Sequence, residues 1–121
     1  MSTISTTETV RSADWASEWF NSKLKSHPTK GQAGYAPIPK EFVVQAGILD
    51  IVGTPDADSK IQIVSSVRGQ SETVYYEQAI TADNMSDSWT FSSIKGNEFQ
   101  VKLYLGAMTS CKLAADYNVI F

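Results

Sequence analysis

The chain has 121 residues, of which 42% are hydrophobic and 19% charged, a composition typical of one globular domain and unlike that of a disordered chain or a collagen-like repeat. Its single cysteine, Cys111, excludes an internal disulfide. Ten lysines and arginines against thirteen aspartates and glutamates give a formal net charge of -3. The basic excess that binds many phosphates is missing, so we expect no nucleic-acid partner.

Residues 1–11 are rich in serine and threonine and hold little to bury. This composition predicts a flexible N-terminal arm, with a short edge strand at Ile4 as the alternative. The segment has neither the basic start nor the apolar stretch of a signal peptide, and no run of about 20 apolar residues follows it. We therefore expect a cytoplasmic protein, with non-classical release as the route to the outside.

Residues 12–27 have the pattern of an amphipathic helix. Ser12 is a favourable N-cap, and His27 is followed by a proline that would end the helix. With about 3.6 residues per turn, the apolar side chains fall on one face. The residues of this face that we consider for self-association are Trp15, Trp19, Phe20 and Leu24.

Residues 28–40 are rich in proline and glycine and predict a linker. The linker leaves two positions for the helix, packed on the sheet of its own chain or on a second copy. Our hypothesis takes the second position, so that the protein is a homo-oligomer.

From residue 41 onward the hydrophobic period changes to two, which predicts strands joined by short turns. The expected strands cover residues 42–52, 60–68, 73–81, 89–92, 99–105 and 111–121. Short connections exclude helical crossovers, so the sheets should be antiparallel. We predict a mainly β domain, an antiparallel two-layer β-sandwich of six strands over residues 41–121 with one N-terminal helix. A partly open β-barrel is the alternative.

Side chains that usually carry catalysis are scarce. His27 and Cys111 are the only histidine and cysteine, and Cys111 has the inward parity of a buried strand residue. The nucleophile elbow, the phosphate-binding loop and the zinc-protease helix motif are all absent from the sequence. We therefore predict a protein that is not an enzyme and that needs no cofactor.

Aromatic residues and acidic turns are the remaining candidates for a binding site. Aromatic faces suit the apolar side of a sugar ring, and aspartate or asparagine suits its hydroxyls. Residues of both kinds lie near one expected hairpin end: Tyr75, Asp83, Asn84, Asp87 and Trp89. In the turn after the first long strand, Asp56 and Asp58 offer the oxygen ligands that Ca²⁺ prefers, although aspartates are also common in turns for structural reasons.

Because connections after odd-numbered strands of a meander emerge at one edge, the two acidic turns should be neighbours. These features favour a non-enzymatic binding module, lectin-like with a carbohydrate ligand or specific for a protein. One alternative is a structural or assembly subunit of a larger particle. The other is a membrane-active, pore-forming protein, but only Lys23 and Lys25 flank the helix face, so we expect no membrane partner.

Overall fold

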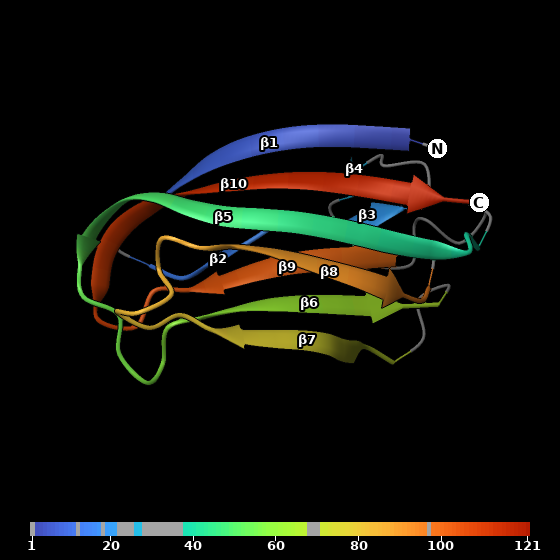
Figure 1. The fold of residues 1–121 in the computed structure, drawn as a ribbon. Helices are drawn as coiled ribbons and strands as arrows, with labels where there is room; N and C mark the ends of the chain where they lie inside the picture. Colours follow the sequence, from blue (N-terminus) through green and yellow to red (C-terminus); the bar gives the residue numbers. More distant parts are fainter. Residues whose placement is uncertain are drawn as a thin grey trace.

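Two antiparallel sheets make up the fold (Figure 1). The computed structural model describes residues 2–11, 13–17, 19–21, 26–27, 38–67, 71–96 and 98–121. The first sheet has the order β1 (Ser2–Arg11), β10 (Met108–Ile120), β5 (Glu41–Gly53) and β8 (Ser88–Ile94). The second has the order β4 (Ser26–His27), β3 (Trp19–Asn21), β9 (Glu98–Tyr104), β6 (Lys60–Ser66) and β7 (Thr73–Ala79), and β2 (Trp15–Ala16) also pairs with β9.

When β2 and β3, which both pair with β9, are counted as one position and the two-residue β4 is left aside, this strand order is that of an eight-stranded jelly roll. Strands β5 to β10 correspond in chain order to the expected strands, and β6 and β7 form the expected hairpin. The prediction of a mainly β protein with antiparallel sheets is therefore confirmed. Among the described residues no ladder joins the two sheets, so the arrangement is a sandwich and not a partly open barrel.

The core lies between the sheets because each long strand alternates buried, mostly apolar side chains with more exposed ones. Aromatic rings cross the interface. Phe42 of the first sheet and Phe99 of the second have ring centroids 4.3 Å apart, and Tyr117 of the first sheet lies 5.8 Å from Phe99. Cys111 is buried in this core with 2% of its surface exposed, as its parity indicates.

The predicted N-terminal helix is wrong. Its described residues are extended along the second sheet, where Trp15 is opposite Leu103 and Phe20 is opposite Phe99. The Ser17 N–H also donates to the Val101 carbonyl oxygen, 2.8 Å away. A lone helix of this length is marginal in water, whereas pairing satisfies the backbone at the edge of β9, and aromatic residues favour strands.

The flexible arm expected for residues 1–11 is likewise not what the structure shows. Strand β1 pairs with β10 along its length, from Ser2 opposite Val119 to Arg11 opposite Ser110. Threonine is β-branched and suits a pleated strand, and Val10 is buried. The segment therefore folds as a full edge strand, longer than the one considered at Ile4.

Most of the expected linker, residues 28–37, lies outside the described part of the chain. Just after it, Pro39 is buried and the Lys40 N–H donates to the Ile120 carbonyl oxygen at 2.8 Å. In the segments that the structure describes, no helix has the length and hydropathy needed to cross a membrane.

Candidate functional site

The turn between β7 and β8 holds three of the expected ligand-binding residues. The Asn84 side chain is already engaged there: its Oδ1 accepts the Thr81 N–H at 2.8 Å, and its Nδ2 donates to the Ala79 carbonyl oxygen at 3.0 Å. Asp83 and Asp87 are exposed to solvent. Asn84 therefore shapes the turn, as asparagine commonly does, and leaves the two carboxylates as the accessible groups.

The turn between β5 and β6 is built in a similar way around Asp56. Its Oδ1 accepts the Asp58 N–H at 3.0 Å, and its own N–H donates to the Ser59 hydroxyl at 3.0 Å. Gly106, at a φ of 58°, packs closely against Asp56 and Ser59. These contacts assign Asp56 to turn structure, while Asp58 stays exposed.

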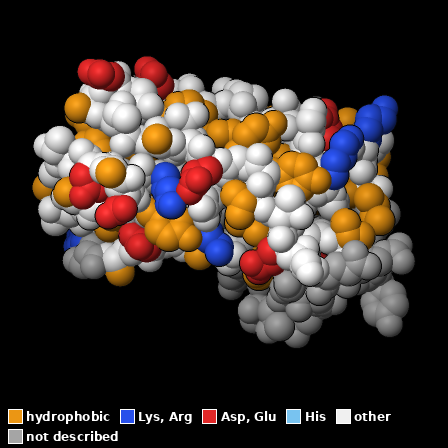
Figure 2. Space-filling model, turned by 90° about the horizontal axis from the view of Figure 1, so that it is seen from below, with side chains coloured by type: hydrophobic (Ala, Val, Ile, Leu, Met, Phe, Trp, Pro, Cys, Tyr) orange, Lys and Arg blue, Asp and Glu red, His pale blue; other side chains and the backbone are white. Residues whose placement is uncertain are grey.

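The two acidic turns lie next to each other, because the Ile80 N–H donates to the Ser59 carbonyl oxygen at 2.9 Å. Figure 2 shows acidic side chains gathered at this end of the molecule. Within the described segments, however, no three aspartate, glutamate, histidine or cysteine residues form a group that could hold a metal ion. The turns thus form an acidic surface without a calcium-binding cluster.

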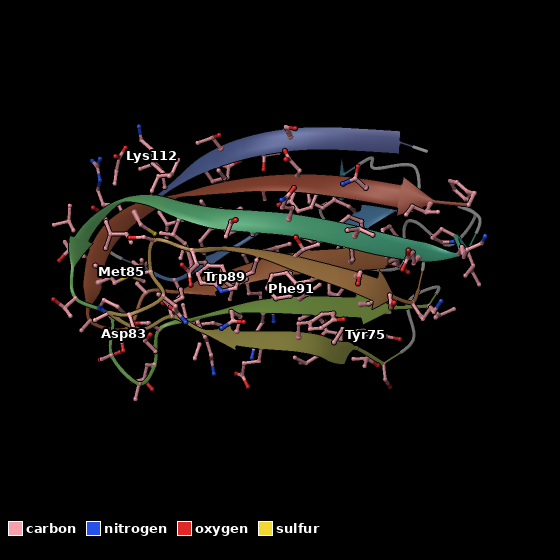
Figure 3. The ribbon with its side chains drawn as sticks, viewed as in Figure 1. Tyr75, Asp83, Met85, Trp89, Phe91 and Lys112 are labelled. Carbon is pink, nitrogen blue, oxygen red and sulfur yellow. The ribbon has the colours of Figure 1, made fainter. Side chains whose placement is uncertain are left out.

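The aromatic members of the expected sugar site do not join these turns as a group. Figure 3 shows Tyr75 near the opposite end of β7 from Asp83. Trp89 is half-buried and packs against the core. The five residues proposed from the sequence therefore divide between two ends of the sandwich and its interior.

The described self-association residues lie on β2 and β3 of the second sheet, next to β9. Trp19 is 8% exposed, and Trp15 and Phe20 are half-buried against the core. The Phe20 ring lies 5.4 Å from Phe99 and 5.3 Å from Tyr117. Leu24 is outside the described residues. The expected interface on a helix face therefore has no helix to carry it.

A cleft that the sequence did not indicate opens between β1 and the strands β2 and β3. Its volume is about 280 Å³. We call it the aromatic cleft, and it is lined by Thr6, Glu8, Trp15, Ala16, Ser17, Phe20 and Tyr117. Once β1 is known to be a strand, a period of two places Thr6 and Glu8 on the inward face with Val10. The flexible arm predicted for residues 1–11 and the helix predicted for residues 12–27 hid this arrangement.

Tyr117 forms the floor of the aromatic cleft, with 1% of its surface exposed. Burial raises the pKa of its hydroxyl, a hydrogen bond from Thr6 acts in the opposite direction, and the Glu8 carboxylate raises the pKa further. The phenol is therefore neutral at physiological pH and adjoins a carboxylate at the cleft.

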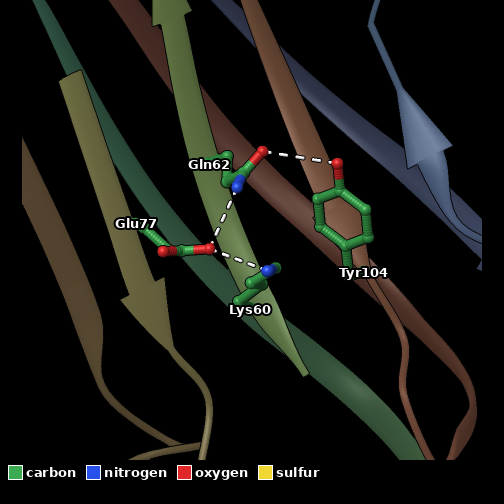
Figure 4. A network of polar contacts seen from close by, with 4 residues as sticks. All are labelled: Lys60, Gln62, Glu77 and Tyr104. Atoms are coloured by element: carbon green, nitrogen blue, oxygen red, sulfur yellow. Dashed lines mark hydrogen bonds and ion pairs between the residues drawn. The ribbon is translucent and has the colours of Figure 1, made fainter. Parts of the chain in front are cut away.

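A polar network covers the outer face of the second sheet (Figure 4). Lys60 Nζ lies 2.7 Å from a Glu77 carboxylate oxygen, which also accepts a hydrogen bond from Gln62. The Tyr104 hydroxyl donates to Gln62 Oε1 at 3.3 Å. The hydrogen bond between Lys60 and Glu77 raises the pKa of Lys60 and lowers that of Glu77. The two side chains are 33% and 50% exposed, so they form a solvated surface ion pair.

Comparisons with known proteins do not place the chain in a family. No family model matches it, and no curated protein is similar to it. A solved structure described as "Bacillus endospore appendages form a novel family of disulfide-linked pili" aligns over 98% of this chain and 89% of its own, with 12% identity and a TM-score of 0.34. At that TM-score the overlay supports no conclusion about function.

Proposed function

We propose that this protein is a structural or assembly subunit that joins copies of itself by strand pairing along β1. The observation that carries the proposal is the character of this edge. Strand β1 has ten residues, lies at the margin of the first sheet, and pairs with β10 without a register shift. Its other side meets no strand among the described residues.

Edge strands of soluble proteins are usually protected by lysine, proline or a bulge, because their unpaired backbone groups can accept another strand. Strand β1 contains no lysine or proline, and its only charged residues are Glu8 and Arg11. By contrast, the ladder that joins edge strand β8 to β5 has a register shift between Phe42 and Val44, and Ser93 has a φ of 61°. Of these two edges, β1 is the one suited to accept another strand.

The difference between the β1 edge and the β8 edge also predicts how copies of the protein join. Two β1 strands paired across a two-fold axis form a closed dimer, whereas β1 paired with β8 of the next copy continues as a filament. Because the irregular β8 edge is a poor acceptor, we expect the β1 dimer as the building unit. The expected sugar site is not gathered among the described residues, so carbohydrate binding is not part of this proposal.

Light scattering coupled to size exclusion tests the proposal with two matched double variants. Ser5→Lys with Thr7→Lys places charges on the exposed outer face of β1, where like charges would oppose each other in the dimer. Thr90→Lys with Ser92→Lys places the same charges on exposed positions of β8.

We expect the native protein to be dimeric or larger, the β1 variant to be a folded monomer, and the β8 variant to assemble normally. A native protein that stays monomeric at high concentration would contradict the proposal. So would a β1 variant that assembles as well as the native chain.

A further inference from the structure

We infer that the aromatic cleft binds a small organic ammonium ion, of the quaternary kind that choline represents. Side chains from both sheets meet there, since Glu8 and Tyr117 come from the first sheet and Trp15 and Phe20 come from β2 and β3 of the second. This role is separate from assembly, because it uses side chains of β1 and not its outer backbone groups.

The charge of the cleft favours a cation. Of the described residues that line it, Glu8 is the one with a formal charge. Its side chain is on the inward face of β1. On the same face, two residues further along the strand, Val10 is apolar and buried. Glu8 remains exposed, so its carboxylate can meet a ligand at the mouth of the cleft without being dehydrated beforehand.

The aromatic rings favour a cation with an apolar surface. Phe20 and Tyr117 have ring centroids 5.3 Å apart, tilted by 37°, and Trp15 lines the same cleft. Aromatic faces carry negative electrostatic potential and attract a cation within about 6 Å of the ring centroid, and such rings are known to recognise quaternary ammonium groups. Tyr117 is buried beneath the cleft, so the partly exposed rings of Trp15 and Phe20 are the ones that a ligand can contact. Together with the Glu8 carboxylate they supply both attractions.

The polar groups of the cleft argue against a neutral sugar. Ser17 is engaged with the second sheet, since its hydroxyl accepts the Val101 N–H at 3.0 Å and its carbonyl oxygen accepts Gln100 Nε2 at 2.7 Å. Thr6 hydrogen-bonds to Tyr117. Sugar hydroxyls need several partners, and these groups are already paired within the protein.

The size of the cleft sets the size of the ligand. A volume of about 280 Å³ is just below the usual range of small-molecule pockets, about 300 to 1000 Å³. This space suits one compact ammonium group with a short chain and is too small for an oligosaccharide.

Isothermal titration calorimetry on the full chain tests the inference with choline as the probe. The neutral alcohol 3,3-dimethylbutan-1-ol has the same shape without the charge, and glucose serves as the sugar. The variants are Glu8→Gln, which removes the charge, and Trp15→Leu, which removes a ring face while keeping an apolar side chain. Glu72→Gln is the matched control, an exposed glutamate that does not line the cleft.

We expect saturable choline binding that Glu8→Gln and Trp15→Leu each weaken by about fivefold, equal to about 1 kcal/mol at 1.4 kcal/mol per tenfold. Glu72→Gln should bind as the native protein does, and the neutral alcohol should bind at least about fivefold more weakly than choline.

Absence of saturable choline binding would overturn the inference, as would equal binding of the alcohol, unchanged affinity in Glu8→Gln, or competition by glucose. Glu8→Gln alters no backbone group of β1. If it loses choline binding while the oligomer persists, assembly and ligand binding are separate properties, and either can fail without the other.

Discussion

Replacement of Phe20 by alanine distinguishes the strand from the helix at the N-terminal end of the protein. In the structure the Phe20 ring lies 5.4 Å from Phe99 and 5.3 Å from Tyr117, and it packs against the core from β3 of the second sheet. On a helix face turned toward a second copy, the same substitution would weaken the oligomer and leave the subunit's own stability almost unchanged.

The expected loss of stability follows from these contacts. Removing a fully buried phenylalanine costs about 3–5 kcal/mol, and each aromatic pair contributes about 0.5–1.5 kcal/mol beyond its buried area. Since Phe20 is half-buried, we expect a loss of about 2–3 kcal/mol. An unfolding entropy of about 2.1 cal/mol/K per residue gives about 0.25 kcal/mol/K for 121 residues. The melting temperature should therefore fall by about 8–12 °C.

Thermal unfolding followed by circular dichroism measures this shift. The matched control is Phe121→Ala, because Phe121 is 57% exposed and its truncation should cost less than about 0.5 kcal/mol. If Phe20→Ala melts within about 2 °C of Phe121→Ala, Phe20 does not pack in the core and our account of β3 is refuted.

Two further predictions concern the buried titratable groups of β10. Cys111 is 2% exposed and burial raises the pKa of its thiol, so a thiol reagent should label it slowly in the native protein and quickly in denaturant. The double variant Cys111→Ala with Phe121→Cys provides a control with an exposed thiol. If the native protein and this control are labelled equally fast, Cys111 is not buried. Burial also raises the pKa of Tyr117, so above pH ~10 the unfolded chain releases a proton that the folded chain retains, and stability falls as pH rises. Urea titrations between about pH 9 and 11 should show a smaller loss for Tyr117→Phe, and parallel losses would show that Tyr117 does not ionise differently on unfolding.

The strands from β5 to β10 were predictable because their side chains alternate between the core and solvent, and this alternation is a local property. Phe99, Val101 and Leu103, for example, are all fully buried, and their spacing of two residues is visible in the sequence. The short turns also excluded helical crossovers, although of the turns between β5 and β10 only the one between β6 and β7 joins strands that pair with each other.

The N-terminal region was mispredicted because its local pattern fits two structures. Trp15, Trp19 and Phe20 form an apolar stripe at helical spacing, yet the same aromatic residues favour strands. The choice depends on a partner that lies far away in the chain, since Trp15 pairs opposite Leu103 and Phe20 opposite Phe99. A window along the sequence contains no information about that partner.

For the candidate sites, too, the sequence predicted some features and missed those that depend on contacts seen only in the folded chain. The sequence predicted that the acidic turns would be neighbours, and the hydrogen bond from Ile80 to Ser59 shows that they are. It did not reveal that Asn84 and Asp56 are engaged within their own turns. The aromatic cleft was missed altogether, because it exists only when Glu8 and Trp15 lie on strands of two different sheets that face each other.

Strand β1 connects the two proposals, and the geometry of a strand explains how it can serve both. Successive side chains of a strand point to opposite faces of the sheet, while its backbone groups point along the sheet toward neighbouring strands. Glu8 and Thr6 line the aromatic cleft, whereas the outer backbone groups of β1 are directed away from β10. A ligand in the cleft and a second copy at the edge would therefore use different groups of the same strand. Since β10 is the only described strand that pairs with β1, either partner would add a second support to this edge and favour its folded state.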